Sequence, residues 1–141
     1  MRVLVMTTMW RRPALTNYVM GRMNRLRSEY RGPNEFMFLA VGSDEKESRG
    51  IAERNGFEYV EAPNVPLNRK HNVGSRAAKG YDPDALIVIN SDSLFSWNYF
   101  SDILDKLRLQ TFVGIRDLYN LNLSRKLLGY WGGWTRYQSR F

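Results

Sequence analysis

Three oxygen-bearing side chains, those of Asn90, Ser91 and Asp92, directly follow the apolar run of residues 85–89. This run includes four consecutive large aliphatic residues, which predicts a central parallel strand buried on both faces. In open α/β sheets, ligands bind beyond the carboxyl ends of such strands. We therefore expect these three side chains to lie at a ligand-binding edge around which the chain is organised.

Other polar groups fall at predicted strand ends or helix starts, in segments 7–12, 42–44 and 68–74. In the first segment, Trp10 and the two arginines that follow it could stack on a base and meet a phosphate. In the third, Lys70 lies in a predicted loop facing Asp92, where a cation could neutralise a diphosphate. Each residue alone is also explained as a turn, a helix cap or a solvated loop position.

Several common sites are absent from the sequence. It contains neither a Gly-x-x-x-x-Gly-Lys-Ser/Thr phosphate loop nor a Gly-x-Gly-x-x-Gly fingerprint after its first strand, so the common ATPase and dinucleotide functions lose their main support. No Gly-x-Ser-x-Gly elbow occurs either. With no cysteine and one histidine, the chain can form neither a disulfide nor a zinc cluster.

The hydrophobic pattern predicts alternating strands and helices that would position these segments. The predicted strands cover residues 2–7, 35–41, 57–60, 85–90 and 111–115. The predicted helices cover residues 13–29, a short segment from about residue 46, a segment that ends at Gly80, and residues 97–109. This order predicts a three-layer α/β/α fold with a mostly parallel sheet and right-handed crossovers. Residues 116–141 are rich in glycine and aromatic residues and fit an aromatic-lined loop, with a mobile or partner-covered tail from residue 130.

Composition bounds the class of protein. A chain of 141 residues suits one domain, and its net charge of +7 suits nucleic acid, an acidic membrane surface or a phosphorylated small molecule. No apolar run reaches the roughly 20 residues of a membrane span, and the N-terminus does not fit a signal peptide. The lack of cysteine is compatible with a reducing compartment, and we expect a cytoplasmic protein.

Taken together, the four polar segments resemble the nucleotide-sugar half of a GT-A glycosyltransferase of the family 2 type. The family's first strand ends in a Pro-Thr-Tyr-Asn-Arg-Pro-like loop, to which Thr7-Thr8-Met9-Trp10-Arg11-Arg12-Pro13 is similar. Its Asp-Asp-Gly-Ser-x-Asp motif is shortened here to Gly42-Ser43-Asp44, and its Ala-Arg-Asn-x-Gly motif resembles Lys70-His71-Asn72-Val73-Gly74. Its Asp-x-Asp motif falls on Asn90-Ser91-Asp92. The resemblance covers roughly residues 2–107 and rests on the order of the motifs.

The resemblance implies a GT-A type fold and a nucleotide-sugar site. The implied donor contacts are Thr7, Thr8, Trp10, Arg11, Gly42, Ser43, Asp44, Lys70, His71, Asn72, Asn90 and Ser91. Asp92 matches the family acid that binds Mn²⁺ or Mg²⁺ bridging the donor diphosphate, and such hard cations take oxygen ligands. Asn90 stands where the family has an acid, so Asp92 would bind the cation alone.

The function implied is metal-dependent transfer of a sugar from a nucleotide diphosphate donor, a UDP-sugar, to an acceptor that the sequence does not identify. Inverting members of the family use an Asp or Glu after the metal strand as catalytic base, and Asp117 is the best-placed candidate here. We expect residues 1–141 to form a single GT-A-like domain whose acceptor half is short or truncated after about residue 116.

Two other functions remain open on the sequence. A nucleotidyltransferase uses a similar sheet and a metal-binding acid, but it normally has a glycine-rich, lysine-containing phosphate loop that this chain lacks. A non-catalytic nucleic-acid-binding domain is favoured by the charge of +7 and the interleaved aromatic residues.

Overall fold

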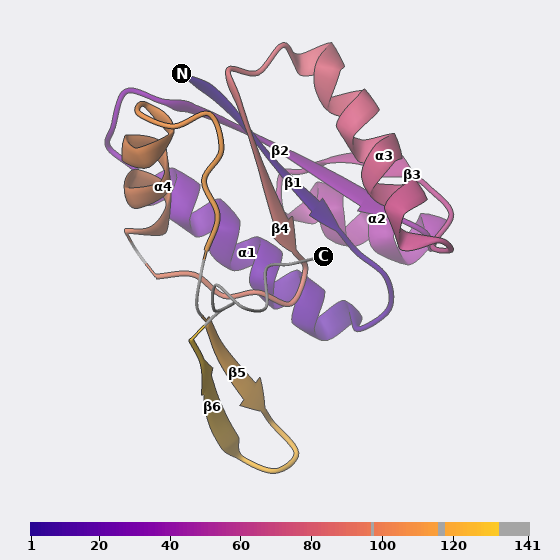
Figure 1. Ribbon diagram of the computed structural model, residues 1–141. Coiled ribbons are helices and arrows are strands. Elements are labelled where there is room, and N and C mark those ends of the chain that lie inside the picture. Colours follow the sequence, from indigo (N-terminus) through magenta and orange to yellow (C-terminus); the bar gives the residue numbers. More distant parts are fainter. Residues whose placement is uncertain (97, 116–117, 133–141) are drawn as a thin grey trace. The chain divides into compact units, whose positions relative to one another are not determined.

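The computed structural model describes residues 1–96, 98–115 and 118–132 (Figure 1). The chain divides into two compact units, Met1–Ser101 and Asp102–Phe141. The first unit contains the sheet and its helices, and each unit is described by itself.

The first unit is built on a four-stranded parallel sheet. Its strands are β1 (Arg2–Thr8), β2 (Glu35–Gly42), β3 (Glu58–Glu61) and β4 (Ala85–Asn90), in the order β3-β2-β1-β4. Every neighbouring pair is parallel. The predicted mostly parallel sheet is therefore confirmed, and β3, from the predicted strand of residues 57–60, lies at an edge of the sheet.

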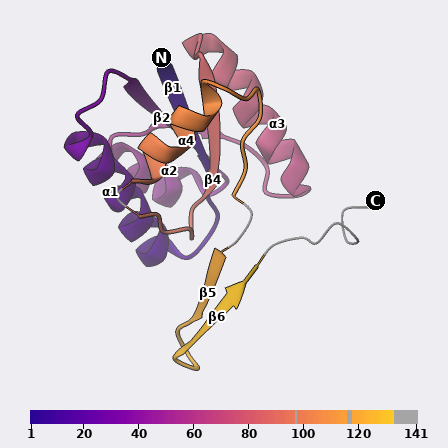
Figure 2. The same ribbon diagram turned by 60° about the vertical axis from the view of Figure 1, so that its left-hand side comes forward.

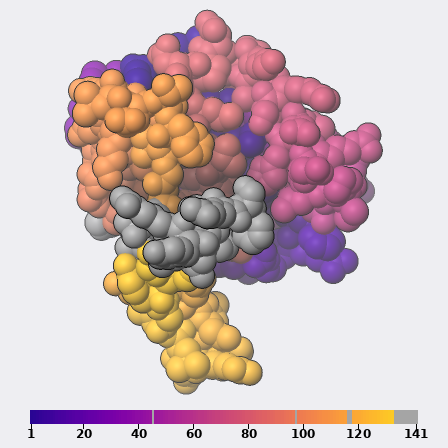
Figure 3. All heavy atoms as spheres, viewed as in Figure 1, coloured from indigo at the N-terminus to yellow at the C-terminus, as the bar shows by residue number. Residues whose placement is uncertain are grey.

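Helices lie on both faces of the sheet. They are α1 (Pro13–Glu29), α2 (Glu45–Arg54) and α3 (Leu67–Ala78), the last followed by the 3₁₀ turn η1 (Lys79–Tyr81). Figures 1 and 2 show α1 and α2 on one face and α3 on the other, a three-layer α/β/α arrangement. In Figure 3, where α3 is pink, its outer side forms part of the molecular surface.

The order of the strands fixes where a crevice can open. From β1 the chain steps outward to β2 and then β3, and α3 returns it to the other side of β1, where β4 pairs. The strand order therefore reverses between β1 and β4. In doubly wound sheets, ligands bind beyond the carboxyl ends of the strands at this switch point.

The core lies on both faces of β1 and β2. Leu4 and Met6 of β1 belong to a buried cluster with residues of β2 and α3. On the opposite face, the rings of Phe38 and Phe57 lie 4.7 Å apart, as do those of Phe36 and Phe100. Successive side chains of a strand point to opposite faces, so two layers of helices are needed to bury them.

The predicted position of β4 at the centre of the sheet is wrong. In the described part of the chain β4 pairs only with β1 and is an edge strand. Ile87 and Ile89 are buried, whereas Leu86 and Val88 of the other face are 40% and 49% exposed. The physical reason is that α3 packs over β1 and β2 on that face. An all-aliphatic run thus need not mean burial on both sides.

The predicted fifth strand at residues 111–115 is also wrong. The chain there is irregular, and Phe112 and Ile115 are exposed. The preceding helix is α4 (Tyr99–Leu107), and the second unit continues with an antiparallel hairpin of β5 (Leu118–Asn122) and β6 (Leu127–Trp131). This hairpin replaces part of the expected aromatic loop, because two short segments close together in the chain pair with each other. Most of the predicted tail, residues 133–141, lies outside the described residues.

Within the described residues, no helix combines the length and the apolar character that crossing a membrane requires.

Candidate functional site

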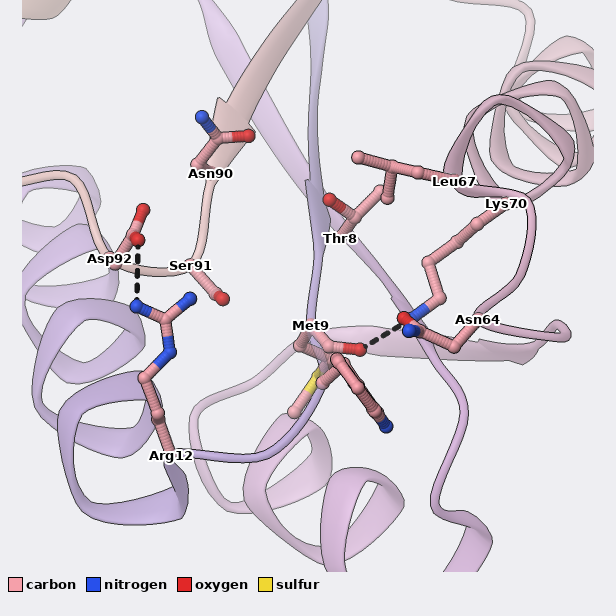
Figure 4. Close-up of a pocket in the computed structure, with 10 residues that line it drawn as sticks. Thr8, Met9, Arg12, Asn64, Leu67, Lys70, Asn90, Ser91 and Asp92 are labelled. Atoms are coloured by element: carbon pink, nitrogen blue, oxygen red, sulfur yellow. Dashed lines mark hydrogen bonds and ion pairs between the residues drawn. The ribbon is translucent and has the colours of Figure 1, made fainter.

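A pocket of about 370 Å³ opens at the carboxyl ends of β1 and β4 (Figure 4). Its walls come from the loop after β1, the segment that leads into α3, and the end of β4. The lining residues are Thr8, Met9, Trp10, Arg12, Asn64, Leu67, Lys70, Asn90, Ser91 and Asp92. The pocket therefore lies at the switch point of the sheet, where the topology predicts a ligand.

Strand pairing places the floor of the pocket. Thr8 at the end of β1 is the register partner of Asn90 at the end of β4, so their side chains point to the same face. Met9 then leaves the sheet, and its N–H donates to the carbonyl oxygen of Val41 at 2.9 Å. The end of β1 is therefore held beside the pocket by its pairing with β4 and by this hydrogen bond to β2.

Arg12 and Asp92 form an ion pair on one side of the pocket. Arg12 Nη1 donates to Asp92 Oδ2 at 3.0 Å, and the side chains are 61% and 39% exposed. Arg11 and Arg12 have φ angles of 55° and 52°, the left-handed region that non-glycine residues rarely adopt. Pro13 begins α1 immediately afterwards. This constrained turn positions the guanidinium at the pocket.

Lys70 reaches the pocket from the opposite side, within α3 (Figure 4). Its side chain is only 1% exposed, and Nζ donates to Met9 O at 2.7 Å and Asn64 Oδ1 at 3.0 Å. Burial lowers the pKa of Lys70 below its ordinary value. The nearby carboxylates of Asp44 and Glu61 raise it and offset part of this shift. An anion bound beside this ammonium would also favour its protonated form.

The helix that carries Lys70 begins earlier than the sequence predicts. Residues 68–74 were expected to be a loop leading into the helix, but α3 starts at Leu67 after Pro66. Lys70 is therefore a buried helical residue rather than a solvated loop residue. Burial alone would disfavour a lysine here, and the two oxygen acceptors compensate by satisfying its ammonium.

The structure brings together five of the twelve predicted donor contacts and the predicted metal ligand. Those that line the pocket are Thr8, Trp10, Lys70, Asn90, Ser91 and Asp92. The guanidinium of Arg11 instead stacks over the Trp10 ring, 4.3 Å from its centroid. Thr7 is fully buried, and its Oγ1 has no hydrogen-bond partner among the described residues. Because strand side chains alternate, Thr7 points away from the face that carries Thr8.

The predicted donor contacts at the end of β2 do not line the pocket. Ser43 Oγ donates to the carbonyl oxygen of Ala62 at 2.7 Å, which ties the end of β2 to the residue after β3. Asp44 precedes α2, but in the described part of the chain its side chain makes no capping hydrogen bond. Its carboxylate acts through charge instead and raises the pKa of Lys70. His71 and Asn72 of α3 also lie outside the pocket lining.

Gly42 has a packing role. A Cβ placed on it would lie 2.6 Å from Tyr59 Oη and 2.7 Å from Ser48 Cβ. We expect Gly42→Ala to destabilise the fold by about 1–3 kcal/mol, the usual cost of overpacking. Urea unfolding measures this cost.

Gly80→Ala is the matched control for Gly42→Ala, because a Cβ at Gly80 meets no described atom within 4 Å. Its free energy of unfolding should stay close to that of the original chain. Equal effects of the two substitutions would contradict the packing role of Gly42.

The residues of the pocket do not fit a divalent cation held by the protein. Asp92 is the only carboxylate of the described residues that lines the pocket, and Arg12 already occupies one of its oxygens. Among the described residues, no group of at least three His, Cys, Asp or Glu side chains is arranged to hold a metal ion. The predicted Mn²⁺ or Mg²⁺ at Asp92 stays a prediction.

Some lining residues were not predicted from the sequence. Met9, Asn64 and Leu67 line the pocket, and Arg12 was recognised only as a residue that could meet phosphate. Asn64 lies between Pro63 and Pro66 in a segment that gives no sign beyond an extended loop. Its use as an acceptor for Lys70 depends on tertiary packing. The predicted base, Asp117, lies outside the described residues.

Comparison with protein-family models, with curated proteins and with solved structures found no match to this chain.

Proposed function

We propose that the chain binds the diphosphate of a nucleotide sugar, a UDP-sugar, in this pocket and transfers the sugar to an acceptor hydroxyl. The observation that carries the proposal is the placement of Arg12 and Lys70 on opposite sides of a pocket at the switch point of the sheet. Guanidinium and ammonium groups form strong charge-assisted hydrogen bonds with phosphate oxygens. A diphosphate between them would meet both cations.

The surrounding side chains support the same ligand. Thr8 and Ser91 offer hydroxyl groups and Asn90 an amide to a sugar or ribose, and each can donate or accept hydrogen bonds. Trp10, which lines the pocket and is 40% exposed, offers an aromatic face to a base. The set contains groups suited to each part of a nucleotide sugar.

In the proposed reaction, the bond between the sugar C1 and the diphosphate oxygen breaks, and its electron pair leaves with the diphosphate. A bond forms between C1 and the acceptor oxygen, which gives up its proton. Arg12 and Lys70 would stabilise the negative charge that develops on the departing diphosphate, and fixed cations in a pocket do this without reorganising. The proton that the acceptor oxygen gives up passes to water or to an oxygen of the departing diphosphate.

The first test is binding. We expect isothermal titration calorimetry to show saturable binding of UDP, weaker binding of UMP and weakest binding of uridine, because the cations contact phosphate. Single-stranded DNA, titrated over a series of salt concentrations, is the competing ligand. Absence of UDP binding together with a steep salt dependence for DNA would contradict the proposal and favour nucleic-acid binding.

The second test is turnover. Incubation with a UDP-sugar should release UDP as sugar is transferred to an acceptor or to water. A nucleotidyltransferase would instead cleave within the diphosphate, transfer the nucleoside monophosphate group to an acceptor and release a sugar phosphate. Each assay is run with and without the predicted divalent cation, so that a need for the cation is measured separately from binding and turnover.

The cytoplasmic location expected from the sequence stays a prediction.

A further inference from the structure

The ion pair of Arg12 with Asp92 bears on how the pocket neutralises a diphosphate. Asp92 is the residue at which the resemblance places a divalent cation, yet its Oδ2 accepts from Arg12 Nη1 at 3.0 Å. The guanidinium comes from a turn in which Arg11 and Arg12 both have left-handed backbone angles. Such angles cost free energy in non-glycine residues and cluster at functional sites.

The pocket offers one cationic side chain for each phosphate of a nucleotide sugar, and Asp92 leaves the occupied pocket with a net charge of −1. Its charged lining residues are Arg12 and Lys70, both positive, and Asp92, which is negative. The phosphates of a nucleotide sugar each carry a negative charge, so the two cations match them in number. A guanidinium has five N–H donors, and the bond to Asp92 leaves others available for a phosphate.

We propose that the pocket binds the diphosphate without a divalent cation, with the guanidinium of Arg12 in the place that the cation would take. Asp92 is then a positioning residue that holds Arg12 and does not ligate a metal. This inference rests on the proposed nucleotide-sugar function and adds the way in which the diphosphate charge is neutralised.

An exposed ion pair is worth little as a source of stability. The proposed role of Asp92 is therefore to orient the Arg12 guanidinium toward the pocket, and its contribution to the stability of the fold is small. Asp92→Asn keeps an oxygen acceptor for Arg12 and removes a negative charge from the pocket. The proposal predicts that UDP binding is retained or strengthened in this variant, whereas a metal held by Asp92 predicts that it is lost.

The experiment is calorimetry of the full chain with UDP, once in EDTA and once with Mn²⁺. We expect affinities within about threefold of each other in the two buffers, since each tenfold change would require about 1.4 kcal/mol. Arg12→Gln should weaken binding in EDTA at least about tenfold, the loss of a charge-assisted contact. Arg76→Gln removes the same charge from an exposed position of α3 outside the pocket and should leave the affinity unchanged.

Each outcome decides between the proposals. UDP binding that requires Mn²⁺ and disappears in Asp92→Asn would overturn the metal-free inference and leave the proposed function standing. Absence of UDP binding in both buffers would overturn both. If circular dichroism shows that Arg12→Gln alters the fold, Arg12→Lys and Asp92→Asn test the inference instead. Arg12→Lys should retain part of the affinity for UDP in EDTA. Loss of all UDP binding in Asp92→Asn would overturn the inference.

Discussion

Lys70→Met should reduce the affinity for UDP at least about tenfold while changing the affinity for uridine little. Methionine keeps the unbranched stem of this buried side chain but removes the ammonium. A hydrogen bond to a charged group contributes about 1.5–3 kcal/mol, and about 1.4 kcal/mol corresponds to a factor of ten in affinity. Calorimetry with UDP and uridine measures the two effects separately.

Lys79→Met is the matched control, because Lys79 lies in η1, is exposed and is not part of the pocket lining. It removes the same charge and should leave UDP binding unchanged. Lys70 also satisfies Met9 O and Asn64 Oδ1, so Lys70→Met should lower the free energy of unfolding as well. An equal loss of affinity for UDP and uridine would show that Lys70 acts only through the fold.

The largest effect on stability is expected at β4. Ile89→Ala should cost about 2–5 kcal/mol, because Ile89 is 4% exposed and its truncation leaves a cavity. Val88→Ala, one residue earlier on the opposite face, should cost within about 0.5 kcal/mol, as at other exposed positions. Urea unfolding of both variants measures the difference.

The comparison of these neighbours tests the orientation of β4 directly. Both residues are β-branched, lie in the same strand and lose side-chain atoms to the same alanine. Similar large costs at Val88 and Ile89 would mean that both faces of β4 are buried. The sequence alone favoured that arrangement, whereas the structure places Val88 at 49% exposure.

Local patterns predicted most of the elements of the first unit. The apolar run of residues 2–7 became β1, and Pro13 began α1 as expected of a proline in the first helical turn. These predictions succeed because strand and helix periodicity, together with proline and glycine positions, act over a few residues. The alternation of strands and helices also predicted the parallel sheet, since parallel neighbours need long crossovers.

The candidate site was partly predictable for a similar reason. Residues that follow parallel strands gather at one edge of the sheet, so Thr8, Asn90 and Asp92 could be expected near one another. The same reasoning did not distinguish Thr7 from Thr8, because the side of the strand that faces the pocket depends on register. It also assigned a ligand role to Gly42, whose neighbours show it to be a close-packing position.

By itself, the sequence determined the kind of fold and the segments from which a site could be built, because both depend on local patterns along the chain. Only the tertiary structure decided that β4 is an edge strand in the described residues, since exposure depends on which helix covers which face. It also decided that Arg12 pairs with Asp92 and that Lys70 is buried against Asn64. These contacts join residues from separate elements, and charge and solvation are set by such neighbours rather than by residue type.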